Sequence, residues 1–437
     1  MVKISKNILC IEKYERLLEE ASFARKSAVD GCNVLQPNCM KSWKKIQGHL
    51  SNALKKEGFE DWYFPLLIPM KSFQKQKKHL EGFMSELLIA KNKGNEMLKE
   101  ELAIRPTSEA IMYDSIAGLA KKKLPIKINQ FCSVIRWEYK RPNVLLLRDN
   151  EFLWQESHSL HKKKEEAEQM TKKMLGHYRK IIEDILCLPV IVGEKPNRRK
   201  FPGAKVTFAL EALMKDKKSI QLATSHFLGH NFSSTFHLKN KGKLAWQSCH
   251  GITTRALGAA IFFHMDKKGI CLPPKISPCL VACIDKKSYD SIKVKDKTMA
   301  KSKDEAFFSG IPLVARASKG KIIIESRKGE KAKASVKNSA KAINSMAQKI
   351  QMEMKKNAQN FLSNHQLSTE RREEFKKLLN EKKGFITANW CESEDCSKKV
   401  KEETGASLRV SQKAFGEKKC IICGKKSSKS AVFAPSY

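Results

Sequence analysis

Four short polar motifs lie between residues 105 and 258 of this chain. They read RPTSE (105–109), RWE (136–138), LWQESHS (153–159) and GITTRALG (251–258). Three of them contain an arginine, and all four carry hydroxyl, carboxylate or imidazole groups. A guanidinium binds phosphates and carboxylates through paired hydrogen bonds. Such a set suits a pocket that holds a nucleoside triphosphate beside a small amino acid.

The elements that must position these motifs are predicted to be mostly strands. Strand-forming residues dominate from Leu124 to Gln155, and a GxGxxG or GxxxxGK[ST] motif is absent, which argues against parallel-sheet nucleotide folds. The pattern predicts an antiparallel sheet with flanking helices. Predicted strands cover 31–37, 62–69, 126–128, 132–137, 145–147, 188–192, 206–210, 220–223 and 242–247. Predicted helices cover 9–28, 40–58, 161–186 and 254–264.

Alternation along two of these strands predicts which polar residues share a face. Trp154, Glu156 and His158 are two residues apart, as are Arg136 and Glu138, so each set faces one side of its strand. Core packing is the competing interpretation for Trp154, and a surface ion pair is the competing interpretation for a single arginine.

Composition predicts a globular protein with a basic surface. The chain has 437 residues, which favours two or three domains, and 41% of them are hydrophobic. Lys+Arg number 84 against 46 Asp+Glu, a formal charge of +38. A nucleic-acid partner is one explanation of this charge, and a lysine-biased solvated surface is the other.

The remaining composition predicts a cytoplasmic protein without a membrane span. No stretch approaches the ~20 apolar residues of a membrane-spanning helix. The 13 cysteines are scattered over a long chain, unlike a dense disulfide framework, so most are expected to be reduced and buried.

In this order and spacing the motifs resemble the catalytic domain of class II aminoacyl-tRNA synthetases, specifically prolyl-tRNA synthetases of the archaeal and eukaryotic type. The similarity extends over the stretches PIKINQFCSVIRWEYKRP (125–142), FLWQESHS (152–159) and TSHFLGHNF (224–232), and it is collinear from about residue 31 to 274. It implies activation of L-proline by ATP, then transfer of the prolyl group to tRNA(Pro).

The resemblance implies a role for individual residues. Arg136 and Arg255 are implied as the catalytic arginines, at the α-phosphate and the γ-phosphate of ATP. Thr107 and Glu109 are expected at the prolyl ammonium, because a hydroxyl and a carboxylate accept its two protons. The implied ATP-binding residues are Arg136, Glu138, Arg148, Gln247, Thr253 and Arg255. The implied proline-binding residues are Thr107, Glu109, Arg136, Trp154, Glu156, His158, Phe201, Thr224 and His226.

Metal ions are expected at two places. Mg²⁺ is expected with ATP, because it usually bridges the phosphates in such transfers. Cys391, Cys396, Cys420 and Cys423 have the C-x4-C and C-x2-C spacing of a tetrahedral thiolate site, and the family carries a structural zinc module here. A redox disulfide is the alternative. No HExxH motif occurs, so zinc is not expected at the pairs His158/His161 or His226/His230.

The predicted fold class is α+β: an antiparallel class II sheet with flanking helices, a shortened α/β anticodon-binding-like domain and a C-terminal zinc-binding-like module. The predicted boundaries are 1–274, 275–345 and 346–437, the last including a helical linker. Strands are predicted at 279–284, 311–315 and 321–325. By resemblance, residues 40–69 form the dimer interface of the class, which predicts a homodimer; an ordinary buried helix and strand is the alternative.

Departures from the family leave alternatives open. Lys205 replaces an acidic residue, Cys249-His250 replaces a small residue and tryptophan, and Asn150 stands where an arginine is common. One alternative is a synthetase-like RNA-binding or regulatory protein with weak catalysis; another is a synthetase of the same subclass for a different small amino acid, such as threonine. The chain ends in Ser436-Tyr437, as many relatives do, and the resemblance predicts that a C-terminal tag impairs activity.

Overall fold

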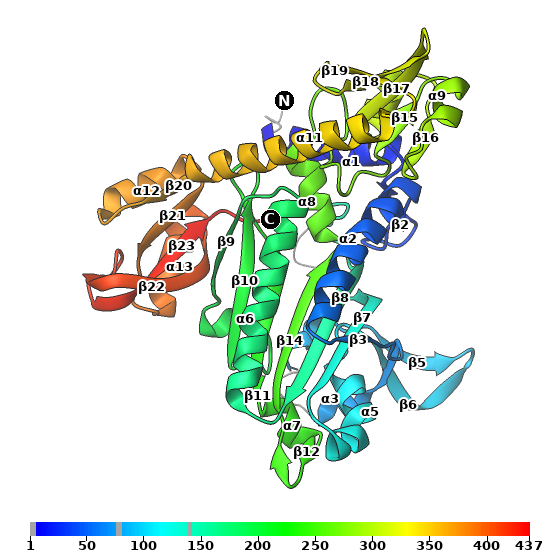
Figure 1. Ribbon diagram of the computed structural model, residues 1–437. Coiled ribbons are helices and arrows are strands. Elements are labelled where there is room, and N and C mark those ends of the chain that lie inside the picture. Colours follow the sequence, from blue (N-terminus) through cyan, green and yellow to red (C-terminus); the bar gives the residue numbers. More distant parts are fainter. Residues whose placement is uncertain (1–5, 76–80, 139–141) are drawn as a thin grey trace.

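A large mixed sheet forms the centre of the computed structural model, which describes residues 6–75, 81–138 and 142–437 (Figure 1). Tyr139, Lys140 and Arg141 of the family-like stretch therefore lie outside the described residues. The sheet has 11 strands. In spatial order they are β20 (Gln366–Ser368), β21 (Phe385–Asn389), β23 (Lys426–Ala434), β22 (Ser407–Lys419), β9 (Val190–Glu194), β10 (Val206–Leu213), β11 (Ser219–Gly229), β14 (Trp246–Thr253), β8 (Glu151–His161), β7 (Ile126–Ile135) and β3 (Glu60–Asp61).

The strands β7, β8, β14, β11, β10 and β9 pair antiparallel in this order. LWQESHS lies on β8, the start of GITTRALG lies on β14, and RWE follows the end of β7. The longer helices around this sheet and its neighbours are α1 (Lys6–Glu20), α2 (Pro37–Lys56), α5 (Glu109–Lys122), α6 (Lys164–Lys180), α8 (Arg255–His264), α11 (Ser339–Ser363), α12 (Arg372–Asn380) and α13 (Glu394–Thr404). The class II antiparallel sheet with flanking helices is confirmed.

Helix α6 covers one face of the antiparallel strands and contacts β8, β10, β11 and β14 (Figure 1). Its apolar face includes Ala167, Met170, Met174 and Tyr178, all buried. Its first turn is acidic and its last turn is basic, which matches the direction of the helix dipole. The cavity described below lies among side chains that the same strands contribute.

A smaller sheet of five strands follows in the sequence. Its order is β16 (Lys297–Met299), β15 (Val281–Cys283), β17 (Leu313–Ser318), β18 (Lys321–Ser326) and β19 (Lys331–Ser335). The pairs β15–β16 and β15–β17 are parallel, and the later pairs are antiparallel. Short helices α9 (Lys286–Ser291) and α10 (Lys303–Phe308) and the long α11 pack around its strands.

The C-terminal residues form four strands and two helices around a core of their own. Strand β22 lies beside β9 through the pair Ser411 and Glu194, so the C-terminal strands continue the central sheet. A third sheet, β4 (Leu67–Pro69), β6 (Glu96–Ile104) and β5 (Ile89–Lys93), leads into the RPTSE motif. Other short elements are β1 (Ala24–Arg25), β2 (Val34–Leu35), α3 (Met70–Gln74), α7 (Asn231–Thr235), β12 (Lys239–Asn240), β13 (Lys243–Leu244) and the 3-10 turns η1 (Met84–Glu86) and η3 (Asn197–Arg199).

Some predicted elements differ from the structure. Residues 145–147 form a turn rather than a strand, because the Asp149 carboxylate accepts the Leu146 N–H at 3.1 Å and Leu146 has a positive φ of 62°. The first helix ends at Glu20 instead of continuing to Ala28. Within 62–69 only Leu67–Pro69 is a strand.

One predicted helix is also shorter than expected. His161 belongs to β8, and residues Ile181–Ile185 at the other end form a π-helical turn. Among the residues that the structure describes, no helix is both long and apolar enough to cross a membrane.

Candidate active site

A polar cavity of about 300 Å³ opens among β8, β10, β11 and β14. Twelve of the predicted site residues line it: Thr107, Glu109, Arg136, Glu138, Trp154, Glu156, His158, Phe201, Thr224, His226, Thr253 and Arg255. A larger cavity, of about 700 Å³, lies between α8, α11 and the five-stranded sheet, but none of the four motifs contributes to its lining. The smaller cavity is therefore the candidate active site.

The RPTSE motif forms the link between β6 and α5. Arg105 is buried, and its guanidinium donates to the carbonyl oxygens of Phe64 at 2.7 Å and Ser133 at 2.9 Å. It therefore anchors the loop instead of facing the cavity. Thr107 Oγ1 donates to Glu109 Oε2 at 2.5 Å, which fixes a carboxylate at the first residue of α5.

Glu156 and His158 form a buried hydrogen-bonded group on β8. The Glu156 carboxylate accepts from Ser108 Oγ and from Gln130 Nε2, the latter at 2.7 Å. His158 Nε2 lies 3.3 Å from Glu156 Oε2, and its Nδ1 lies 2.9 Å from the Tyr113 hydroxyl. Burial opposes the charge on both groups. The contact with His158 nevertheless lowers the pKa of Glu156, and the contact with Glu156 raises the pKa of His158.

Arg136 is enclosed by three aromatic rings. Its guanidinium carbon lies 5.2 Å from the ring centre of Phe83, 5.6 Å from that of Phe152 and 5.3 Å from that of Trp154. Its Nε donates to the Pro106 carbonyl at 2.9 Å. Burial lowers its pKa. Cation–π contacts and a fixed Nε hold the planar group in one orientation.

Arg255 begins α8 on the same side of the cavity as Glu138. Its Nε donates to the Leu147 carbonyl at 2.8 Å, and its backbone N–H donates to Thr253 Oγ1 at 3.0 Å. The turn at residues 145–147, which the sequence predicted as a strand, thus supplies the acceptor that fixes this arginine. Burial lowers the pKa of Arg255, and the charges of Glu138 and Asp149 oppose that effect.

A chain of hydrogen bonds supports the wall formed by Phe201. The Phe201 N–H donates to Thr207 Oγ1 at 3.0 Å, and Thr207 Oγ1 lies 2.9 Å from His226 Nδ1. His226 Nε2 lies 2.8 Å from Thr224 Oγ1. The Phe201 and His226 ring centres are 4.7 Å apart. Burial, with the nearby charges of His158 and Arg136, lowers the pKa of His226 to about 3, so its ring is neutral at neutral pH.

Two predicted ATP-binding residues do not line the cavity. Gln247 is buried beneath it, where its Oε1 accepts from Ser233 Oγ at 2.6 Å. Arg148 follows the 145–147 turn, and its backbone N–H donates to the Val144 carbonyl at 2.8 Å. Both are close in sequence to residues that do line the cavity, Thr253 and Asp149.

The three departures from the family occupy different places. Lys205 is exposed and lies 5.7 Å from the Trp246 ring centre, and it does not line the cavity. His250 does line it, with Nδ1 3.1 Å from Ser157 Oγ, and burial lowers its pKa well below the usual value. Asn150 accepts the Glu138 N–H at 3.2 Å and donates to the Asp30 carbonyl at 3.0 Å.

Several lining residues were missed by the sequence analysis. Arg199 and Lys200 follow β9, and their only signal was a short basic run. Cys249 is buried, and its thiol lies with Glu109 and His158 in a group whose ligand atoms are all within 4.8 Å of one another. Burial raises the pKa of this thiol well above its usual value. A carboxylate, an imidazole and a thiol so close together can hold a small cation.

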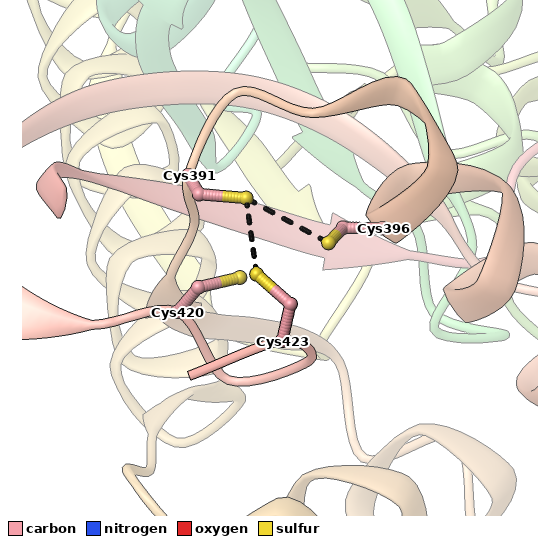
Figure 2. A group of neighbouring side chains, drawn as sticks. All are labelled: Cys391, Cys396, Cys420 and Cys423. Atoms are coloured by element: carbon pink, nitrogen blue, oxygen red, sulfur yellow. Dashed lines mark hydrogen bonds between the residues drawn. The ribbon is translucent and has the colours of Figure 1, made fainter. Parts of the chain in front are cut away.

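The four C-terminal cysteines meet at one point, although 32 positions separate Cys391 from Cys423 (Figure 2). Cys391 Sγ lies 3.6 Å from Cys396 Sγ and 3.5 Å from Cys423 Sγ, and all four sulfurs lie within 4.8 Å of one another. Disulfide sulfurs are about 2.05 Å apart, whereas sulfurs around tetrahedral zinc are about 3.8 Å apart. The spacing therefore fits a zinc ion and does not fit a disulfide.

The pKa shifts within the cluster differ in direction: burial raises the pKa of Cys391 and of Cys396, whereas that of Cys423 is lowered. Cys391 follows β21, Cys396 lies in α13, and Cys420 and Cys423 lie in the turn between β22 and β23. A backbone N–H at Lys425, with the neighbouring thiols, lowers the pKa of Cys423 to about 7. A zinc ion requires deprotonated cysteine ligands.

The last residues of the chain pack beside β11. Ser219 N–H donates to the Pro435 carbonyl at 2.7 Å, and the Tyr437 ring lies 6.0 Å from Phe262 and 4.9 Å from Lys218 Nζ. Tyr437 does not line the candidate cavity, but Gln221, two residues after Ser219, does.

Comparison with known proteins gives matches over nearly the whole chain. Residues 91–261 match the family described as "tRNA synthetase class II core domain (G, H, P, S and T)", and residues 372–437 match "Prolyl-tRNA synthetase, C-terminal". A proline–tRNA ligase from Borrelia garinii subsp. bavariensis is 36% identical over 481 aligned residues, covering 97% of each chain. Since 481 exceeds the 437 residues of this chain, that relative has segments that are missing here.

Further relatives agree. A proline–tRNA ligase 2 from Clostridioides difficile is 34% identical, covering 97% of this chain and 95% of that one. The crystal structure of a prolyl-tRNA synthetase from Cryptosporidium parvum, complexed with halofuginone and AMPPNP, superposes with a TM-score of 0.88 at 28% identity, covering 97% and 94% of the two chains. With the motifs placed around one cavity and these full-length similarities, the chain belongs to the prolyl-tRNA synthetase family of class II aminoacyl-tRNA ligases.

Proposed function

We propose that the cavity activates L-proline with ATP and then transfers the prolyl group to the terminal adenosine of tRNA(Pro). The observation that carries this proposal is the convergence of two arginines, Arg136 and Arg255, with the Thr107–Glu109 pair on one buried cavity. In the first step the proline carboxylate attacks the α-phosphorus and pyrophosphate leaves. In the second, a ribose hydroxyl attacks the prolyl carbonyl and AMP leaves.

The nucleotide is assigned to the side of the cavity that Arg136, Glu138 and Arg255 line. The aromatic rings around Arg136 hold its guanidinium so that it would neutralise the α-phosphate and the attacking carboxylate. Arg255 would neutralise the terminal phosphates. Such fixed cations stabilise charge that develops in the transition state. Thr253 helps to hold Arg255, and Gln247 and Arg148 would act from positions just outside the lining.

The amino acid is assigned to the side that β8 and β11 form. The Glu109 carboxylate, held by Thr107, would accept a hydrogen bond from the secondary ammonium of proline. Trp154 and Phe201 would enclose the ring, while Glu156, His158, Thr224 and His226 form the polar edge. No protein nucleophile is needed, because positioning and charge neutralisation account for both steps.

Metal ions and partners complete the proposal. Glu138 and Asp149 supply carboxylate oxygens of the kind that Mg²⁺ prefers, and Mg²⁺ would neutralise the phosphates of bound ATP. Cys391, Cys396, Cys420 and Cys423 would hold a structural Zn²⁺. We further propose a cytoplasmic homodimer that binds tRNA(Pro) through its basic surface.

The test is proline-dependent exchange of pyrophosphate into ATP, measured on untagged protein beside threonine, alanine and cysteine. Exchange with proline that disappears in Arg136→Ala, while Lys205→Ala retains it, supports the proposal. Lys205 is the matched control because it is a cation near the site that does not line the cavity. Folded protein that shows no exchange with any of the four amino acids would instead favour an RNA-binding role.

A further inference from the structure

We propose that the C-terminal cysteine-bearing module positions one wall of the active site, and that Arg409 is the positioning residue that links them. The wall is the pocket loop, residues 195–201, which contributes Arg199, Lys200 and Phe201 to the cavity lining. The expected change in the KM for proline rests on the proposed function. The expected change in the position of the pocket loop does not.

The pocket loop is attached to β22 of the module by two side chains. Arg199 Nη1 donates to the Leu408 carbonyl at 2.7 Å, and Lys195 Nζ donates to the Arg409 carbonyl at 3.1 Å. Arg198 also pairs with Glu394, at the start of the helix that carries Cys396. Three residues of the loop are thus bonded to a part of the chain that lies 196 to 214 positions further along the sequence.

A buried carboxylate lies between the two parts. Glu211 is fully buried; its Oε1 lies 2.5 Å from Lys195 Nζ, and its Oε2 accepts from Arg409 Nη2 at 2.8 Å and Nε at 3.1 Å. Ser219 Oγ donates to the same Oε2 at 2.7 Å. Because all these groups are desolvated, loss of one cation leaves the others without full compensation. Arg409 therefore determines where Glu211, and through it Lys195, can lie.

The strand contacts next to this ion group leave little room for movement. Ser411 Oγ donates to the Glu194 carbonyl at 3.1 Å, and Gln412 Nε2 donates to the Val192 carbonyl at 2.9 Å. Among the residues that the structure describes, one residue pair, Ser411 with Glu194, forms the ladder between β22 and β9. Side-chain bonds, more than backbone pairing, therefore hold the two strands together at this edge.

Phe201, at the C-terminal end of the pocket loop, contacts other residues of the cavity wall. Phe201 donates its N–H to Thr207, and its ring lies 4.7 Å from that of His226 at an angle of 39°; both Thr207 and His226 line the cavity. If the pocket loop lost its bonds to β22, Phe201 and Arg199 would move, whereas Arg136 and Glu109 would keep their positions. The expected result is weaker binding of proline with a small effect on the chemical step.

The experiment compares full-length wild type with Arg409→Gln, Arg409→Lys and the control Lys429→Gln. Lys429 pairs with Glu392 at 2.8 Å within the same module, and it takes no part in the hydrogen bonds and ion pairs described above between the module and the pocket loop. In pyrophosphate exchange, Arg409→Gln should raise the KM for proline about tenfold or more with a much smaller change in kcat, since small displacements of a binding wall are costly. Arg409→Lys keeps the positive charge but not the two hydrogen bonds to Glu211, so its KM for proline should lie between those of wild type and Arg409→Gln.

A second readout does not require activity. Arg198, Arg199 and Lys200 are trypsin sites within the pocket loop. Arg409→Gln should be cleaved there several times faster than wild type or Lys429→Gln, and proline with ATP should slow that cleavage. If wild type shows no exchange, the proposed function fails while the trypsin comparison still tests the loop.

The proposal is overturned if folded Arg409→Lys and Arg409→Gln keep both the wild-type KM and the wild-type cleavage rate at the loop. It is also overturned if kcat falls and the KM for proline does not change. If Arg409→Gln does not fold, the proposal is tested with Arg409→Lys alone, because the positive charge of the lysine still compensates Glu211 and the variant is expected to fold.

Discussion

At the scale of single residues, the carboxylates of the candidate site are held mainly by neutral donors. Thr107 holds Glu109, and Ser108 and Gln130 hold Glu156. Neutral donors fix the orientation of a carboxylate and leave its negative charge for a cation from outside. Glu109 is therefore suited to a ligand ammonium, whereas Glu211, paired with Lys195 and Arg409, is fully compensated within the protein.

Replacement of Glu109 tests this distinction. In Glu109→Gln the KM for proline should rise about 10- to 100-fold, because a hydrogen bond to a charged group contributes about 1.5–3 kcal/mol. The control is Asp114→Asn, which removes an exposed carboxylate from the same helix. Pyrophosphate exchange at varied proline measures both, and an unchanged KM in Glu109→Gln would remove this residue from the proline site.

The Glu211 group predicts a pH dependence of stability. Burial alone would raise the pKa of Glu211, but Arg409 and Lys195 outweigh it and lower the pKa from 4.5 to about 2. A depressed pKa stabilises the folded state above pH 4.5, and that contribution is lost as the pH falls towards 2. The thermal unfolding midpoint of Glu211→Gln should thus be well below wild type at pH 7, and the difference should narrow between pH 4.5 and 2. A constant difference would contradict the ion group.

At the scale of elements, the sequence predicted the strands that carry the motifs better than the turns that complete them. Alternation placed Trp154, Glu156 and His158 on one face of β8, and all three line the cavity. The apolar run at 145–147 predicted a strand, because a local pattern contains no sign of the acceptor that Arg255 requires. Arg199 was missed since its place depends on Leu408, far along the chain.

The contact between β9 and β22 can be tested at Gly193. A Cβ at this position would lie 2.6 Å from Val410 Cβ and 2.7 Å from the Ser411 carbonyl oxygen. Gly193→Ala should therefore lower the thermal unfolding midpoint by several degrees, since overpacking costs about 1–3 kcal/mol. Gly176→Ala in α6 is the control, because nothing lies within 4 Å of its Cβ and alanine favours a helix. Equal midpoints for both variants would argue against close packing of the two strands.

At the scale of the whole molecule, the sequence predicted separate modules and carried no sign of the connection between them. The predicted boundary at 274 lies shortly before β15, whereas the boundary at 345 lies after the five-stranded sheet but inside α11. The prediction of a separate C-terminal module did not include its strands as a continuation of the central sheet. That continuity depends on Glu194 and Ser411, whose types carry no signal for strand pairing.

Metal content provides a test at this scale. Purified protein should contain about one zinc per chain, and Cys396→Ser should lose it together with several degrees of thermal stability, because structural zinc contributes directly to folding. The control is Cys187→Ser, which replaces a buried cysteine outside the cluster. Elemental analysis with thermal unfolding measures both effects. If Cys396→Ser kept its full zinc content, the metal would have to bind outside the four-cysteine cluster.

The continuous central sheet has a consequence for synthesis of the chain. Strands β7 to β14 and the catalytic motifs leave the ribosome before β22, so the outer edge of β9 stays uncovered while more than 150 further residues are made. An uncovered strand edge is a template for wrong pairing. Stalling or truncation before residue 407 should therefore yield aggregates, and chaperone demand should be concentrated in this interval of translation.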